Sequence, residues 1–332
     1  MQITGPGRAR ASRWRIVRAA VAILLTAAVL WQTDFGAVLD AMRGPNPAPL
    51  VAAVALVILD RALNGWRWVA LLGAIDPSHR PSLRRALRVF FVSTFLGTFL
   101  PGSVGGDAVR TVATTRLGVP AADAAASVVL DRLLGAIGIL LVAVLGLATM
   151  PDLAADTVVV AAVAFGSVVA AAGAALVFSR AGAAAAERLI GWMPGRRLRD
   201  VGTTLVETVR VHGKNRARMS AVLAASVLVQ LLRVLEAWTL GLALGLPVGL
   251  EVYFGLVPLI LLIILLPVTV NGIGTSQAAF VWLFGRSGVD PADAFALSVL
   301  FLALGVVGNL PGAVLYAFPP DIDEAARGVR RG

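Results

Sequence analysis

Eight of the charged side chains that interrupt the apolar segments of this sequence stand out as candidates for a site. Four are arginines and four are carboxylates: Arg61, Arg110, Arg132 and Arg233, with Asp60, Asp107, Asp131 and Glu236. An ionisable side chain at membrane depth costs several kcal/mol unless it is paired or hydrated, so each one is a functional candidate. Arginine stays charged and can grip a phosphate at two points, so this set favours a polar cavity that receives an anionic group.

The carboxylates allow two readings of the same residues. In the first, they balance the arginines when the cavity is empty or carry protons in a coupled cycle. In the second, the charges form buried pairs that only fix helix register, and Arg67 and Arg132 partly snorkel. Arg233 and Glu236 are three residues apart and can pair within one helix, whereas Asp60, Asn64 and Arg67 share a helix face. Adjacent residues on a helix point about 100° apart, so Asp131 and Arg132 face different partners.

The composition places these charges in a membrane protein. The 332 residues are 58% hydrophobic and 14% charged, which is too apolar for a soluble domain. Without cysteine and with two histidines, the chain offers no metal-binding set, and we expect neither metal nor cofactor. The net charge of +10 gathers at segment ends, a pattern typical of the positive-inside rule and of anionic lipid headgroups rather than nucleic acid.

Hydropathy and loop charge predict one integral membrane domain over residues 1–332. We expect an N-terminal span and outer loop (15–47), a first repeat (48–150), a linking span with an Arg-rich cytoplasmic segment (151–218), a second repeat (219–318) and a cytoplasmic tail (319–332). Spans are expected near 16–31, 50–72, 121–150, 158–178, 221–246 and 292–318. Residues 198–211 read either as a helix on the inner leaflet or as a solvated helical loop. Both termini would be cytoplasmic.

Two further apolar runs, 90–100 and 252–266, are shorter than the roughly 20 residues a helix needs to cross a bilayer. Each ends in residues that break helices: Pro101, Gly105 and Gly106 after the first, and Pro267, Gly272 and Gly274 after the second. Arg84, Arg85 and Arg88 precede the first run and read as a cytoplasmic loop. We expect re-entrant hairpins, with Thr269 and Asn271 satisfying freed backbone groups and Ser276 with Gln277 lining the cavity. Ser276 reads equally as the cap of a helix start.

The chain also repeats itself. LPGSVGG at 100–106 matches LPVTVNG at 266–272, and GVPAADAAASVVL at 118–130 matches GVDPADAFALSVL at 288–300. The spans before the breaks share Arg61, Asn64 and Trp66 against Arg233, Glu236 and Trp238. Three crossings separate the units, so the repeats should be inverted, as in carriers whose binding site lies between two broken helices. The expected fold is therefore an all-α polytopic bundle with an inverted repeat and two broken hairpins.

The motifs FLPGSVGGDAVR at 99–110 and LLPVTVNGIG at 265–274 resemble the lysylphosphatidylglycerol synthase transmembrane-region family, also called flippase-like or UPF0104 proteins. The resemblance covers about residues 15–318 and carries over Gly105, Gly106, Asp107, Arg110 and Arg132. Ser276 and Gln277 depart from it, because many members have Arg-Glu there.

This resemblance implies a lipid flippase of a bacterial cytoplasmic membrane that moves a phospholipid or polyprenyl-phosphate-linked lipid between leaflets. Its substrate would be a membrane lipid, and a glycosyltransferase or lipid-synthesising enzyme is a candidate partner. Two alternatives stay open. One is a transferase that passes a glycosyl or aminoacyl group to a lipid carrier, and the other is a scaffold for a glycosyltransferase. The residues contain no recognisable nucleophile and base pair, so we expect a non-enzymatic protein.

Overall fold

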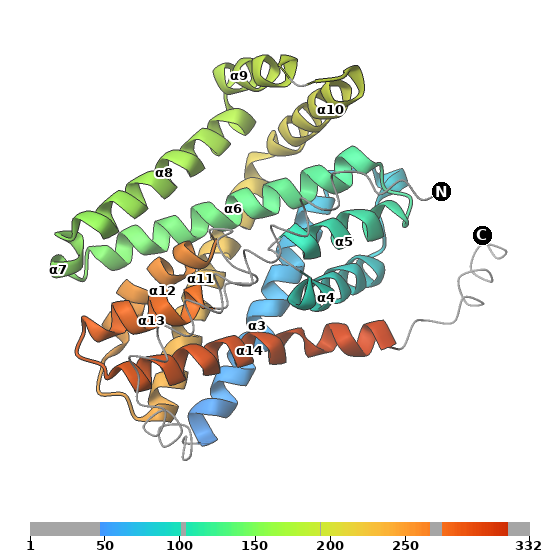
Figure 1. The fold of residues 1–332 in the computed structure, drawn as a ribbon. Coiled ribbons are helices and arrows are strands. Elements are labelled where there is room, and N and C mark those ends of the chain that lie inside the picture. Colours follow the sequence, from blue (N-terminus) through green and yellow to red (C-terminus); the bar gives the residue numbers. More distant parts are fainter. Residues whose placement is uncertain (1–46, 101–103, 193, 266–273, 318–332) are drawn as a thin grey trace, which may run out of the picture.

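A computed structural model of the chain describes residues 47–100, 104–192, 194–265 and 274–317. Within these ranges the protein is helical and contains no strand. Five helices are long and apolar enough to cross a membrane: α3 (Pro47–Leu72), α6 (Ala121–Leu147), α8 (Thr157–Phe178), α11 (Arg216–Leu244) and α14 (Pro291–Ala317) (Figure 1). They coincide with five of the six predicted spans, which confirms an all-α polytopic membrane fold. The sixth, at 16–31, lies outside the described residues.

Two pairs of shorter helices occupy the positions of the predicted hairpins. The first pair is α4 (Leu83–Phe99) and α5 (Val104–Thr115), and the second is α12 (Leu250–Leu265) and α13 (Thr275–Gly285). In each pair the two helices contact one another. Residues between the paired helices lie outside the described ranges, and they include Pro101, Pro267, Thr269, Asn271 and Gly272. Re-entry into the membrane and the inversion of the repeats stay predictions.

The structure corrects two expectations about the first pair. Helix α4 begins at Leu83, so Arg84, Arg85 and Arg88 belong to its first turns rather than to a loop. Gly105 and Gly106 lie inside α5 rather than in the break before it. Their lack of a side chain serves close packing instead. A Cβ added to Gly106 would lie 3.2 Å from the Gly97 Cα and 3.2 Å from a backbone oxygen of α4.

The two halves share a local structure after their short helices. Gly118 and Gly288 each lie three residues beyond the end of a short helix and three before the start of a long one, α6 or α14. Both have a positive φ, 90° and 80°, a conformation that glycine adopts without the steric cost of a Cβ. The repeated Gly-Val motif found in the sequence therefore adopts the same turn twice.

The Arg-rich segment forms two helices, α9 (Arg180–Gly191) and α10 (Arg196–Gly213), that pack on the bundle (Figure 1). Helix α10 buries Val209 among apolar side chains of α6 and α11, and His212 Nε2 lies 3.5 Å from Asp123 Oδ1 of α6. The segment is therefore a helix packed on the bundle rather than a solvated loop, and its position on the inner leaflet stays a prediction. Two short elements complete the described chain, η1 (Pro77–His79) and α7 (Pro151–Ala154).

The largest apolar core joins α11, α12, α13 and α14, where Tyr253, Phe280 and Phe284 pack ring against ring. A smaller cluster around Trp68 and Phe90 ties α3 to α4. Helices α3 and α11 pack against each other, and α3 contributes residues to both clusters. The charged residues found in the sequence lie in this central region of the bundle.

Candidate functional site

Asp131 of α6 is a buried carboxylate shared by two arginines. Its Oδ1 accepts a hydrogen bond of 2.8 Å from Arg67 Nε of α3, and its Oδ2 lies 3.5 Å from Arg110 Nη1 of α5. All three side chains are less than one-tenth exposed. Three helices thus meet at one carboxylate. Arg67 is therefore buried in this pair and does not snorkel.

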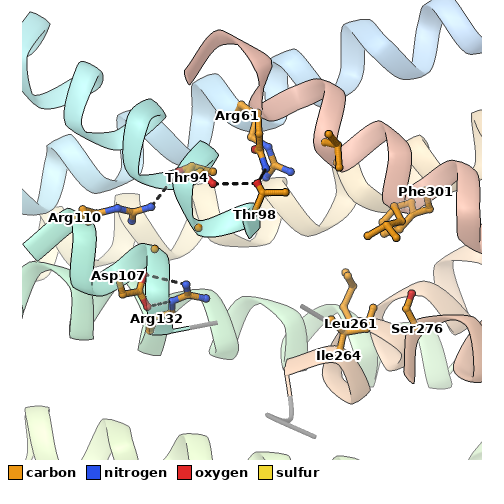
Figure 2. A pocket seen from close by; sticks show the side chains of 16 residues that line it. Arg61, Thr94, Thr98, Asp107, Arg110, Arg132, Leu261, Ile264, Ser276 and Phe301 are labelled. Carbon is orange, nitrogen blue, oxygen red and sulfur yellow. Dashed lines mark hydrogen bonds and ion pairs between the residues drawn. The ribbon is translucent and has the colours of Figure 1, made fainter. Parts of the chain in front are cut away.

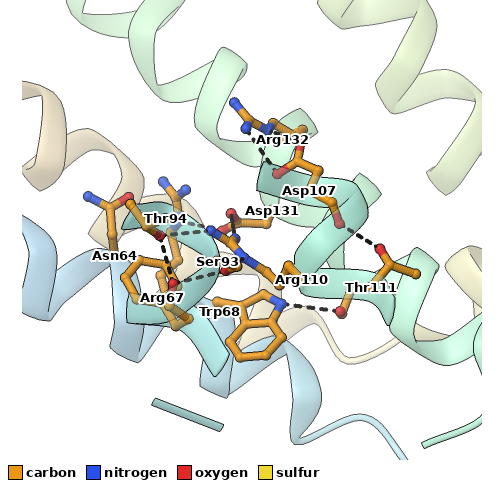
Figure 3. A network of polar contacts seen from close by, with 12 residues as sticks. Asn64, Arg67, Trp68, Ser93, Thr94, Asp107, Arg110, Thr111, Asp131 and Arg132 are labelled. Carbon is orange, nitrogen blue, oxygen red and sulfur yellow. Dashed lines mark hydrogen bonds and ion pairs between the residues drawn. The ribbon is translucent and has the colours of Figure 1, made fainter. Parts of the chain in front are cut away.

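Arg110 is held on every side (Figure 3). Its Nε donates to Ser93 Oγ at 3.2 Å and its Nη2 to Thr94 Oγ1 at 3.3 Å, both on α4. Its guanidinium lies over the rings of Phe90, 4.7 Å from the centroid, and Trp68, 5.5 Å away. Cation–π contacts and charge-assisted hydrogen bonds of this kind keep a desolvated arginine in place. Arg110 mainly anchors α5 to α4.

Asp107 and Arg132 form a second link between α5 and α6. Arg132 Nε donates to Asp107 Oδ2 at 2.7 Å, and Arg132 Nη2 donates to Asp107 Oδ1 at 3.0 Å. Unlike the Asp131 cluster, this pair is accessible, because the Arg132 side chain is 49% exposed. The neighbours Asp131 and Arg132 take separate partners, in agreement with their expected difference in direction.

A third cluster surrounds Asp60 of α3, which is 1% exposed. Asn64 Nδ2 donates to Asp60 Oδ1 at 3.1 Å, and Arg61 Nη1 donates to Oδ2 at 3.0 Å. Arg233 Nε of α11 lies 3.5 Å from the same carboxylate. The carboxylate thus joins corresponding spans of the two predicted repeats. The pairing of Arg233 with Glu236 that helical spacing allows is not formed within 4 Å, because Arg233 turns toward α3.

Glu236 is left without that partner. The residue is 4% exposed, and its Oε1 makes no hydrogen bond within the described part of the chain. A buried carboxylate oxygen without a donor is costly, so this position is unusual for a residue that serves packing alone.

A cavity of about 340 Å³ lies between the two pairs of short helices (Figure 2). Polar side chains line one end, including Arg61, Thr94, Thr98, Asp107 and Arg132. The other end is mainly apolar and is formed by α12 and α14, with Leu261, Ile264, Phe301 and Leu302. Ser276 of α13 also reaches the lining. The cavity is therefore amphipathic along its length.

A neighbouring cavity of about 300 Å³ continues the polar region toward α11. Its lining shares six residues with the first: Arg61, Thr94, Arg110, Arg132, Leu261 and Ile264. It adds Asn64, Arg67, Asp131 and Arg233. The two cavities thus bring together all four arginines predicted as anion ligands.

Two of these arginines are best placed to bind a ligand. Arg61 lines both cavities, and its Nε is a buried donor with no acceptor among the described residues. Arg132 also lines both cavities and is half exposed. A guanidinium that faces a cavity can bind a phosphate at two points. Arg110 and Arg67 already direct their donors to protein acceptors.

Gln277, near the start of α13, contacts the backbone rather than the cavity. Its Oε1 accepts a hydrogen bond of 2.7 Å from the backbone N–H of Gly274, which precedes α13 with a φ of 83°. Gln277 is 4% exposed and is not among the residues that line either cavity. The predicted contributions of Pro101, Pro267, Thr269, Asn271 and Gly272 lie outside the described residues.

Sequence reasoning missed several neutral polar residues of the site. Ser93 and Thr94 hold Arg110, and Ser226 Oγ accepts from Arg67 Nη1 at 3.1 Å. Asn309 Nδ2 of α14 donates to Thr98 Oγ1 at 2.9 Å across the cavity lining. Serine, threonine and asparagine occur in many membrane helices as local backbone partners, so their types alone carry little signal. A polar residue within two turns of the predicted helix break at Pro101 was the available clue for Thr94 and Thr98.

The comparisons with known proteins agree with this membrane architecture. No curated protein matches the chain. Residues 15–312, nearly the whole chain, match the family described as Lysylphosphatidylglycerol synthase TM region. The helices that carry Asp107, Arg110, Asp131 and Arg132 all fall within that match. The chain therefore belongs to the Lysylphosphatidylglycerol synthase TM region family.

Proposed function

We propose that this protein moves a lipid with an anionic polar head between the leaflets of a bacterial cytoplasmic membrane. The observation that carries the proposal is the amphipathic cavity between the two pairs of short helices, with Arg61 and Arg132 at its polar end. A headgroup phosphate would bind there, while the lipid chains stay against apolar side chains and the bilayer. The candidate lipids are a phospholipid and a polyprenyl-phosphate-linked lipid.

The pairing of Arg132 supports a mechanism for release. A phosphate that enters the cavity competes with the Asp107 carboxylate for the guanidinium of Arg132. When the lipid leaves, Asp107 takes back the arginine, so the empty site does not hold an unpaired charge. Such an exchange keeps binding weak enough for turnover. Glu236 is the residue we propose to take up a proton in a coupled cycle.

Charge in the loops supports a topology with both termini in the cytoplasm. We further propose that the protein acts as a transporter rather than as a transferase, because the cavity presents arginines already paired with carboxylates. A glycosyltransferase or lipid-synthesising enzyme that supplies the lipid remains the expected partner.

Transport is tested with the purified full-length protein in phosphatidylcholine vesicles that contain a trace of fluorescently tagged lipid. Dithionite bleaches only the outer leaflet, so loss of more than half of the signal reports movement between leaflets. Tagged phosphatidylglycerol, tagged phosphatidylcholine and lipids identified by mass spectrometry in the purified protein form the substrate panel. We expect faster loss for an anionic lipid.

The matched variants are Arg61→Gln with Arg132→Gln, and Arg116→Gln as a control on an exposed arginine outside both cavities. We expect the double variant to slow transport about tenfold or more, because hydrogen bonds to charged groups contribute about 1.5–3 kcal/mol each. Equal rates in the double variant and the control would overturn the arginine site. Group transfer to a lipid in the same vesicles, without movement, would favour the transferase.

A further inference from the structure

A second basic cavity lies apart from the proposed transport site, between α6, α8, α10 and α11. Its volume is about 760 Å³, larger than either cavity of the site. Four basic side chains line it: Arg180, Arg210, Lys214 and Arg216. No acidic residue belongs to the lining.

The charge of this cavity is not balanced by the protein. None of its four basic side chains forms an ion pair with another described residue. The five arginines around the transport site, by contrast, each lie within 4 Å of a carboxylate. Like charges gathered in one concavity repel, and a bound anion relieves that repulsion.

The floor of the same cavity is apolar. It is formed by Leu134 and Ile137 of α6, Val177 and Phe178 of α8, and Met219 and Leu223 of α11. These helices are three of the five candidate membrane spans. The basic rim lies where α8 ends and α11 begins, which is the level at which a span meets lipid headgroups.

We propose that this cavity binds the headgroup phosphate of an anionic phospholipid, whose acyl chains lie along the apolar floor. Basic pockets between membrane helices bind such headgroups, and a soluble anion would have no use for the floor. This bound lipid is not the transported one. It would tether α9 and α10 to the ends of α8 and α11, and the proposal does not depend on the transport activity.

Native mass spectrometry of the full-length protein tests the proposal, with phosphatidylglycerol and phosphatidylcholine as probes. The test variant is Arg180→Gln with Arg210→Gln. Its control is Arg196→Gln with Arg199→Gln, which removes the same charge from the other end of α10, outside the cavity lining. Arg180→Lys with Arg210→Lys keeps the charge and shows whether a loss reflects folding. The thermal unfolding midpoint is measured for every variant.

We expect phosphatidylglycerol to bind in preference to phosphatidylcholine. When the Arg61→Gln, Arg132→Gln changes are also present, so that the transport site is disabled, the test variant should lose this binding about tenfold while the control and the lysine variant keep it. Binding should persist in the Arg61→Gln, Arg132→Gln variant, and the test variant should still move lipid in vesicles. Equal phosphatidylglycerol binding by the test and control variants would overturn the proposal. Competition by millimolar inorganic phosphate that removes the lipid completely would also overturn it, in favour of a soluble-anion site.

Discussion

Arg132 binds Asp107 at two points, 2.7 and 3.0 Å, while half of its side chain stays exposed. Three residues of the same network behave differently, because Arg67, Arg110 and Asp131 are each less than one-tenth exposed. The network thus combines a buried part, which fixes three helices, with an accessible part that a ligand can enter. This division predicts different consequences for substitutions that look alike in the sequence.

The accessible pair should contribute little to stability. In a double-mutant cycle with Asp107→Asn and Arg132→Gln, we expect a coupling energy of about 1 kcal/mol or less, because solvent and ions screen exposed pairs. Chemical unfolding in detergent micelles measures it. The reference is the cycle of Arg67→Gln with Asp131→Asn, for which a larger value is expected. Equal values in the two cycles would show that the cavity is not hydrated.

Removing the shared carboxylate should have a large effect. Asp131→Asn leaves Arg67 and Arg110 buried without a counter-charge, and breaking a buried pair on one side costs about 3–5 kcal/mol. We expect a much lower thermal unfolding midpoint than in wild type. Asp152→Asn is the control, because this exposed acid lies in the short helix α7. A midpoint for Asp131→Asn close to that of the control would contradict the buried network.

The contact between α4 and α5 should not tolerate a methyl group. Gly106→Ala would bring a Cβ within 3.2 Å of the Gly97 Cα and of the Ser93 backbone oxygen, and backbone atoms cannot move aside as a flexible side chain does. We expect a loss of about 1–3 kcal/mol in stability. Gly191→Ala is the matched control, since nothing lies within 4 Å of its added Cβ. Equal stability of the two variants would show that the helices can separate.

A lysine at position 61 should not support normal lipid movement. Lysine keeps the charge of Arg61 but has a single nitrogen, whereas the guanidinium holds Asp60 through Nη1 and keeps further donors for a ligand in the cavity that Arg61 lines. We expect Arg61→Lys to reduce lipid movement in vesicles about tenfold while the unfolding midpoint changes little. Arg116→Lys serves as the exposed control. Full activity of Arg61→Lys would leave only a requirement for positive charge.

Much of the architecture was predictable because apolar length is a strong signal. Helices α3, α6, α8, α11 and α14 follow the predicted spans, and the turns at Gly118 and Gly288 follow the repeated motif. The polar partners were less predictable. The carboxylate that Arg233 contacts is set by the packing of α11 against α3. Helical spacing describes only neighbours on the same helix, so it could indicate Glu236 but not Asp60.

The two glycines of α5 show the same limit. In the sequence, Gly105 and Gly106 beside Pro101 indicated a break, since glycine favours turns as readily as close contacts. The structure shows that α5 already includes both residues and approaches α4 through Gly106. A glycine's role is set by what lies opposite it, and that neighbour is not encoded locally.

The order of the charges on α5 and α6 influences how the two helices align. Along each helix the acid comes first, Asp107 before Arg110 and Asp131 before Arg132, and the pairs cross so that every contact joins opposite signs. Matching acid with acid would instead set Asp107 against Asp131 and Arg110 against Arg132. The crossed pairs therefore favour one alignment of α5 against α6, because sliding one helix to match acid with acid would replace attraction with repulsion.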